Sequence, residues 1–257
     1  MAKSSTFSLG RTANPALTQK VFDQSIKEYS GTETMTIGGT VNKSAFLLLL
    51  LIISAAYVWM QFIGVQEQPS ATPWILGGAI GGLIVAIIII FKKKTAPYLA
   101  PVYALLEGLA LGAISAIMEN RYPGIVIQAV ALTFGTLFAL LAAYKSGLIK
   151  ATENFKLGVV AATGAVGLIY VATMILGMFG IGIPYIHESG TIGIIFSLVV
   201  VVIAALNLVL DFDFIENGAE KGAPKFMEWY AAFGLLVTLV WLYLEILRLL
   251  SKIRGRK

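Results

Sequence analysis

Four acidic side chains lie within or at the end of long apolar stretches in this chain of 257 residues: Glu107, Asp211, Asp213 and Glu245. An ionisable group held at membrane depth is costly, so acids in such positions commonly serve an ion pathway, a proton relay or a buried pair. Glu107 stands in the middle of its stretch, with no basic residue close to it in the sequence. It is expected to face the interior of a helix bundle, either as a lining acid or as a polar contact between helices.

Asp211 and Asp213 stand directly after an unbroken apolar stretch. Residues two apart on a helix point in different directions, so we expect Asp211 to face inward and Asp213 to reach water at the membrane surface. Asn207 is one turn before Asp211 and shares its face. The three residues therefore predict a short polar track, with Asp211 as a gating or pH-sensing acid.

Glu245 and Arg248 are three residues apart and can pair on one face of a helix. Both stand near the end of the last apolar stretch, where long side chains reach the membrane surface at lower cost. The simpler interpretation is an interfacial ion pair, and the alternative is that Glu245 is a second sensing acid. Glu228, at the start of the same stretch, suits the positive end of a helix dipole.

The sequence lacks the patterns of the common enzyme and metal-site classes. Cysteine is absent and His187 is the only histidine, which excludes thiolate nucleophiles and zinc sites built from His and Cys. Neither a G-x-S-x-G elbow nor a G-x-x-x-x-G-K-[ST] phosphate loop occurs. Basic residues cluster in tails and loops rather than along one face, so nucleic-acid binding is not expected. We predict no enzyme activity, no catalytic residue, no metal and no cofactor.

Stretches of apolar residues must position these acids. Hydrophobic residues make up 58% of the chain and charged residues 13%, and a membrane-spanning helix needs about 20 apolar residues. Seven stretches qualify: 45–65, 73–91, 97–118, 122–144, 157–183, 189–210 and 226–250. The sequence therefore predicts an all-α integral membrane protein with a seven-transmembrane helix bundle. Glycines four apart predict close helix contacts, namely Gly77/Gly81, Gly78/Gly82 and Gly108/Gly112.

The flanking segments set the predicted orientation. Residues 1–43 form a polar N-terminal segment in which apolar residues from Leu17 onward recur at helical spacing, which predicts a helix on the membrane surface. Residues 44–250 form the membrane domain and 251–257 a basic tail. Basic residues are more frequent on the side of the N-terminus, which predicts that this side is cytoplasmic. Seven crossings place the tail outside; a last stretch that enters and returns would instead keep it inside.

Several short segments resemble the transmembrane Bax inhibitor motif family. The segment from Tyr103 to Gly112 resembles the family's aromatic, glycine-containing third helix. Leu210-Asp211 followed by Ile215 resembles the end of its sixth helix, and residues 231–250 resemble its seventh. The resemblance covers about residues 44–250. The polar N-terminal segment and the hairpin at 216–225 resemble a divergent bacterial branch, which implies the bacterial inner membrane.

The resemblance implies a pH-sensitive calcium leak in which one aspartate on the sixth helix and one on the seventh share a proton. Close carboxylates titrate as a coupled pair, and their oxygens are ligands that Ca²⁺ prefers. Asp211 matches the first aspartate. At the second position, the register that matches more residues places Thr238, whereas another register places Glu245. With Thr238 the pair is incomplete, and Asp211 would act with Asp213 or Glu107.

The sequence thus favours a passive cation (Ca²⁺) leak gated by carboxylate protonation. Its predicted partners are the lipid bilayer, Ca²⁺ or protons as permeant or regulatory ions, and other membrane proteins. The alternative is a non-conducting modulator that binds other membrane proteins, such as a quality-control protease. A secondary transporter is less favoured, because the two halves of the chain show no matching broken helices.

Overall fold

The computed structural model describes residues 33–62, 70–180 and 190–256. Within them, seven helices are long and apolar enough to cross a membrane, which confirms the predicted fold class. They are α2 (Ile37–Phe62), α3 (Thr72–Phe91), α4 (Ala96–Arg121), α5 (Ile125–Lys145), α6 (Glu153–Met178), α7 (Thr191–Glu220) and α8 (Met227–Gly255). A 3₁₀ turn, η1 (Lys93–Thr95), joins α3 to α4. The predicted surface helix near Leu17 and the residue His187 lie outside the described residues.

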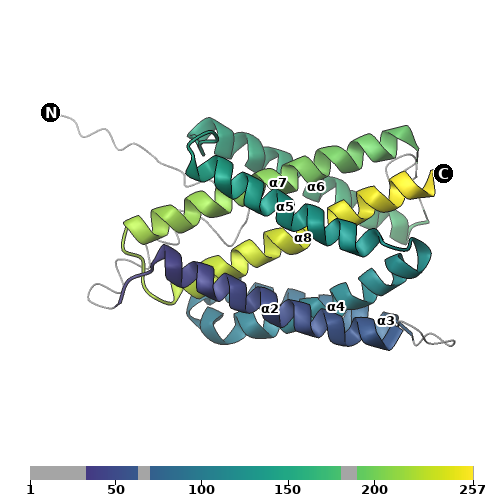
Figure 1. Ribbon diagram of the computed structural model, residues 1–257, viewed down its shortest axis with the longest axis horizontal. Coiled ribbons are helices and arrows are strands. Elements are labelled where there is room, and N and C mark those ends of the chain that lie inside the picture. The colour runs from purple at the N-terminus through teal and green to yellow at the C-terminus, as the bar shows by residue number, and fades with distance from the viewer. Residues whose placement is uncertain (1–32, 63–69, 181–189, 257) are drawn as a thin grey trace.

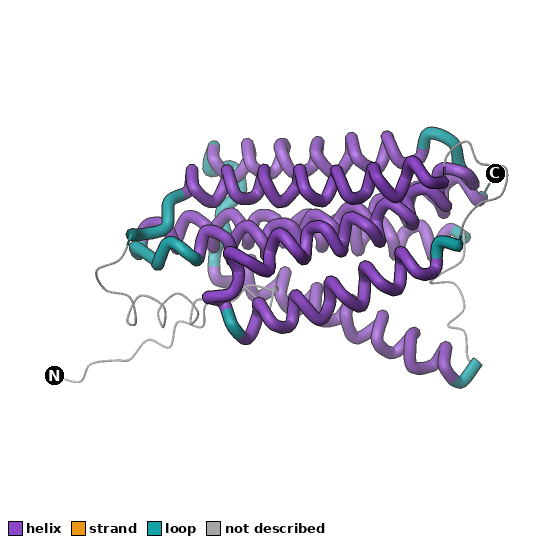
Figure 2. Tube along the Cα trace, turned by 90° about the horizontal axis from the view of Figure 1, so that it is seen from below, coloured by secondary structure: helices purple, strands orange, loops and turns teal. Residues whose placement is uncertain are grey.

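Helix α8 is the centre of the bundle. It contacts α2, α4, α5 and α7, whereas α3 packs mainly on α4 and α6 on α7. The helices run roughly along one axis (Figures 1 and 2). We call the end where α2, α4, α6 and α8 begin the proximal end, and the opposite end the distal end. In lipid a backbone must satisfy its own hydrogen bonds, so long apolar stretches fold as helices.

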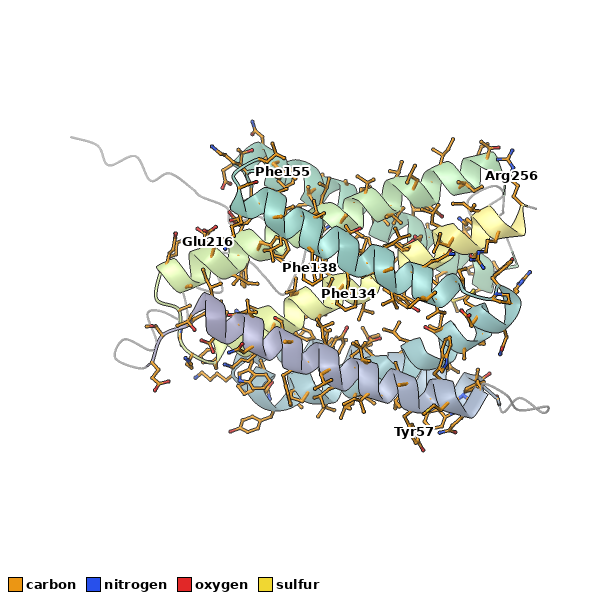
Figure 3. All side chains as sticks on the ribbon, viewed as in Figure 1. Tyr57, Phe134, Phe138, Phe155, Glu216 and Arg256 are labelled. Atoms are coloured by element: carbon orange, nitrogen blue, oxygen red, sulfur yellow. The ribbon has the colours of Figure 1, made fainter. Side chains whose placement is uncertain are left out.

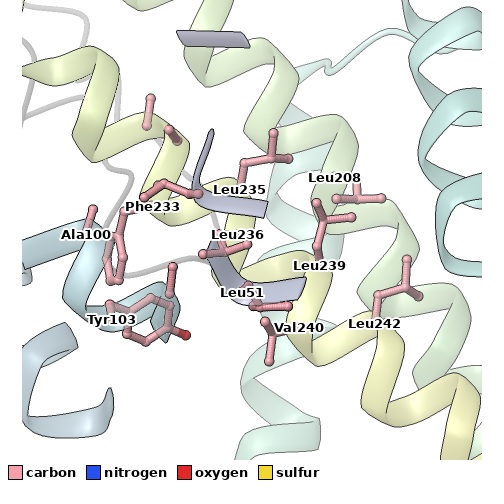
Figure 4. Packing of buried hydrophobic residues seen from close by; sticks show 14 of the residues in the cluster. Leu51, Ala100, Tyr103, Leu208, Phe233, Leu235, Leu236, Leu239, Val240 and Leu242 are labelled. Atoms are coloured by element: carbon pink, nitrogen blue, oxygen red, sulfur yellow. The ribbon is translucent and has the colours of Figure 1, made fainter. Parts of the chain in front are cut away.

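Aromatic and aliphatic side chains fill the contact between α2, α4 and α8 (Figure 4). The rings of Tyr103 on α4 and Phe233 on α8 meet edge to face, with centroids 4.9 Å apart. Leu51 of α2 and Leu236 of α8 are buried in the same cluster. This packing holds α8 between the two halves of the bundle.

The predicted close contacts at glycine are confirmed for two helix pairs. A Cβ atom at Gly108 or Gly112 of α4 would collide with backbone atoms of α2, including the Ala55 oxygen. On α3, a Cβ atom at Gly78 would lie 2.5 Å from the Leu106 oxygen of α4. Small residues here let the backbones approach. Gly77 is the exception, since open space surrounds it.

Helices α2, α7 and α8 extend furthest beyond their predicted apolar stretches. Helix α2 starts at Ile37 rather than residue 45, and α7 continues past residue 210 to Glu220. Helix α8 continues to Gly255, so most of the predicted tail is helical. Because α8 is one continuous helix along the bundle (Figure 1), the alternative in which the last stretch enters and returns is wrong.

Candidate functional site

Asp211 is the most unusual polar group in the described part of the chain. It lies on α7 with no exposed surface, and neither carboxyl oxygen has a hydrogen-bond partner. Leu208, Leu210 and Phe212 beside it are also buried. Asp211 faces the interior of the bundle, as the sequence predicted. A buried polar group without a partner loses its hydrogen bonds to water and gains none in the protein, which destabilises the folded state.

Thr238 of α8 is the polar side chain that lies against Asp211. Its hydroxyl donates instead to the Gly234 carbonyl one turn earlier, at 3.3 Å. The pair therefore places a carboxyl and a hydroxyl at the α7–α8 contact without closing a hydrogen bond between them. The structure brings Asp211 together with Thr238, the first of the two candidates for the seventh-helix position.

Glu245, the second candidate, belongs to a separate cluster between α6 and α8. It is buried, and Oε1 accepts hydrogen bonds from the Tyr170 hydroxyl at 2.8 Å and from Arg248 at 2.8 Å. The Trp241 indole N–H lies 3.3 Å from the same oxygen. Arg248 also donates to the Tyr170 hydroxyl at 2.7 Å. The predicted ion pair between Glu245 and Arg248 is confirmed, and Tyr170 completes it.

Asn207 and Asp213 both turn toward α6. The Asn207 amide donates to the Thr163 hydroxyl and to the Ile203 carbonyl, each at 2.8 Å. Asp213 pairs with Lys156 at 2.6 Å, and its side chain is 18% exposed. These polar groups in the second half of α7 therefore diverge: Asp211 faces α8, whereas Asn207 and Asp213 face α6.

Glu107 is turned away from these groups. It lies half-buried on α4, where a Cβ atom at Gly82 of α3 would be 2.9 Å from its Oε1. Its neighbour on α4 is Tyr103, one turn earlier. Of the two expected roles, a lining acid or a polar contact between helices, the structure agrees with the second, because Glu107 occupies the α3–α4 contact. The structure does not bring it together with Asp211.

Two buried charged groups have partners that the sequence did not indicate. Glu228 is fully buried and pairs with Lys43 of α2 across the proximal end. Lys252 is buried near the distal end and donates to the Ser197 hydroxyl at 2.8 Å and to the Gly193 carbonyl at 3.1 Å. Both contacts join residues far apart in the sequence, so local spacing gives no signal for them.

A cavity opens beside the α7–α8 contact at the proximal end. It has a volume of about 1000 Å³ and lies between α2 and α5, with Leu235 and Leu239 of α8 among its walls. Asp213 and Glu216 lie at its polar margin, where Glu216 accepts a hydrogen bond from the Tyr144 hydroxyl. Figure 3 shows Phe134 and Phe138 of α5, which line the cavity, and Glu216 at the proximal end.

The site as a whole is one unpaired carboxyl inside the bundle, with paired polar groups around it. The described residues contain no group of three His, Cys, Asp or Glu side chains that could hold a metal ion. What this arrangement can do chemically is take up or release a proton at Asp211, at a cost that depends on how much water reaches the α7–α8 contact.

Comparison with known protein families gives one match. The family described as Bax inhibitor 1 like matches residues 14–255, which is nearly the whole chain. No curated protein and no solved structure shows significant similarity to it.

Proposed function

Because the chain belongs to the Bax inhibitor 1 like family, we propose that it is a passive cation leak with Ca²⁺ as the permeant ion and Asp211 as the gating acid. The observation that carries this proposal is the burial of Asp211 with both carboxyl oxygens unpartnered. A structural role would be served better by an apolar residue, because an unpaired acid destabilises the packed α7–α8 contact.

The direction of the pH response follows from hydration. An ionised Asp211 is costly while the α7–α8 contact is dry, and that cost falls when water enters. Ionisation and opening are therefore linked, and each favours the other. Raising the pH shifts the protein toward the hydrated, conducting form, so the leak increases with pH.

The cavity at the proximal end is the entrance that this proposal needs. Asp213 and Glu216 at its margin carry oxygen atoms of the kind that a hard cation such as Ca²⁺ prefers, although each also contacts a protein partner, Lys156 or Tyr144. Buried apolar residues on either side of Asp211, including Leu210 and Phe212, would close the path beyond it. The described conformation is thus the closed one.

Calcium flux into liposomes tests the role of Asp211. Purified protein is reconstituted with a calcium-sensitive dye inside the vesicles, and the initial rate is measured from about pH 5 to pH 9. We expect the rate to rise with pH through one transition, and Asp211→Asn to hold it low and nearly constant. Glu153→Gln is the matched control, because Glu153 is an exposed acid on the first turn of α6. An Asp211→Asn variant with the wild-type pH profile would refute the gating role.

A second candidate function is a non-conducting modulator that binds other membrane proteins. It is favoured by the separation of the acids, since Asp213 and Glu245 each pair with a basic residue of their own. It is also favoured by α6, where open space surrounds Gly158, Gly164 and Gly167, so another helix could approach closely. Liposomes without calcium flux at any pH would support this candidate over the leak.

The orientation also belongs to the proposal. Among the described residues, nine lysines lie at the proximal end and five basic residues at the distal end. The proximal ones are Lys43, Lys92, Lys93, Lys94, Lys145, Lys150, Lys156, Lys221 and Lys225, and the distal ones are Arg121, Arg248, Lys252, Arg254 and Arg256. Basic residues are enriched on the cytoplasmic side of membrane proteins. We therefore place the proximal end in the cytoplasm and the protein in a bacterial inner membrane.

A further inference from the structure

The cavity between α2 and α5, which we call the groove, is open to the outside of the bundle, because Val41 and Phe138 in its lining are 57% and 63% exposed. Val41, Ala45 and Leu48 of α2 line one wall, and Phe138 and Leu141 of α5 line the other. The side chains of these apolar residues form no hydrogen bonds, so they would pack favourably against the hydrocarbon chain of a lipid. A second, smaller cavity of about 330 Å³ shares Leu48 and Phe134 with the first and continues along α2 toward the distal end.

The length of the wider cavity matches one leaflet of a bilayer. Its lining on α2 extends from Ile37 to Leu48, which is about 16 Å of helix at 1.5 Å per residue. The hydrocarbon core of a bilayer is about 30 Å thick, so this is about half of it. An occupant that enters at the proximal surface would therefore reach the middle of the membrane.

Positive charge gathers where the wide cavity meets the proximal surface. Lys145 and Lys150 both line the cavity, are exposed, and form no ion pair within the described residues. The acids at the same margin are engaged, since Asp213 pairs with Lys156 and Glu216 accepts from a tyrosine hydroxyl. The margin therefore presents two ammonium groups to the membrane surface.

We propose that this groove binds an anionic phospholipid, with an acyl chain between α2 and α5 and the phosphate beside Lys145 and Lys150. The apolar walls suit the chain, and the lysines suit the headgroup at the depth where a headgroup lies. A helix from a partner protein fits less well. A helix about 10 Å across and 16 Å long occupies roughly 1,200 Å³, which is more than the volume of about 1000 Å³ of the cavity along that length of α2.

The proposal is tested by native mass spectrometry of the purified full-length protein in detergent. The protein is titrated with dioleoyl phosphatidylglycerol and, separately, with dioleoyl phosphatidylcholine, which has the same chains and no net charge. Wild-type protein should bind the anionic lipid more tightly. Lys145→Gln with Lys150→Gln should weaken that binding about fivefold for each lysine and leave phosphatidylcholine binding unchanged.

Two matched controls separate the groove from general surface charge and hydrophobicity. Lys92→Gln with Lys221→Gln removes the same charge from the same end, outside the groove lining, and should change binding less than about twofold. Ala45→Trp fills the groove and should weaken the binding of both lipids, whereas Leu49→Trp, on an exposed face of the same helix, should not. If Ala45→Trp does not fold, Val41→Phe serves instead, because Val41 lines the groove and is 57% exposed.

Three results would overturn the proposal. The first is equal affinity for the two lipids, and the second is an equal loss in both pairs of lysine variants. The third is unchanged lipid binding in the groove-filling variants; if these change the oligomeric state alone, the groove accommodates a second copy of the chain instead. A bound lipid would occupy the cavity that the proposed leak uses as its entrance. The assay measures binding without ion flux, so its outcome is distinguishable from that of the flux assay.

Discussion

Replacing Glu228 with Gln tests how firmly α2 and α8 are joined at the proximal end. Glu228 is fully buried at the start of α8. It accepts hydrogen bonds from the backbone N–H and the hydroxyl of Thr36, each at 2.9 Å. It also pairs with Lys43 of α2 and, at 3.2 Å, with Lys225. One carboxylate thus connects the residues before α2, α2 itself and the turn that leads into α8.

The expected loss follows from which of these contacts Gln can keep. Gln preserves the shape and still accepts from Thr36, but it removes the charge. Removing one partner of a fully buried ion pair costs about 3–5 kcal/mol. Here the side chain of Lys43 is 19% exposed and that of Lys225 is 45% exposed, so both cations retain part of their hydration. We therefore expect Glu228→Gln to lower the free energy of unfolding by about 2–3 kcal/mol.

Unfolding by SDS in mixed micelles measures this free energy, with loss of helix followed by circular dichroism. A double-mutant cycle with Lys43→Met should give a coupling energy of at least about 1 kcal/mol. Glu153→Gln is the control, because the Glu153 side chain is 68% exposed, and it should change the free energy by less than about 0.5 kcal/mol. If Glu228→Gln has as small an effect as the control, or the coupling is zero, our account of this contact is wrong.

Two further predictions concern packing and orientation. Gly112→Leu should destabilise the protein by about 2 kcal/mol or more in the same unfolding assay, because a Cβ atom there collides with the Ala55 backbone, whereas Gly135→Leu on open surface should have little effect. The chain has no cysteine, so single cysteines report orientation directly. A membrane-impermeant maleimide should label Asn120→Cys in intact cells and Ser146→Cys only after permeabilisation; the reverse pattern would refute a cytoplasmic proximal end.

The spans were predictable because hydropathy and length together determine them, but the helix ends were not. Residues 37–44 contain several polar side chains, which lower the local hydropathy. In the helix these side chains bond to the backbone, as the Ser44 hydroxyl does to the Thr40 carbonyl at 3.0 Å. A hydropathy threshold therefore ends the predicted span too early, while the backbone hydrogen bonds of α2 continue to Ile37.

Polar contacts within one helix were predictable from the sequence, whereas contacts between helices were not. The pair of Glu245 with Arg248 follows from their spacing on one helix turn. Tyr170, which completes that cluster, is on α6 and meets Glu245 only because α6 and α8 approach each other. For Glu107 the sequence left open whether the acid lines a pathway or lies between helices, and the structure places it between α3 and α4. Gly82, which has no side chain, leaves room for the acid on the α3 side, and sequence spacing within α4 carries no information about α3.

Thr238 beside Asp211 limits what kind of pH response the protein can have. Two close carboxyls titrate as a coupled pair, in which the charge of one raises the cost of ionising the other. A threonine hydroxyl does not titrate in this range, and among the described residues no other acid lies beside Asp211: Asp213 pairs with Lys156, Glu245 pairs with Arg248, and Glu107 lies at the α3–α4 contact. The cost of ionising Asp211 therefore comes from its dry surroundings rather than from a second charge. Hydration of the α7–α8 contact then becomes the quantity that a change in pH controls, and a response of one proton per molecule is expected in place of the two-step response of an aspartate pair.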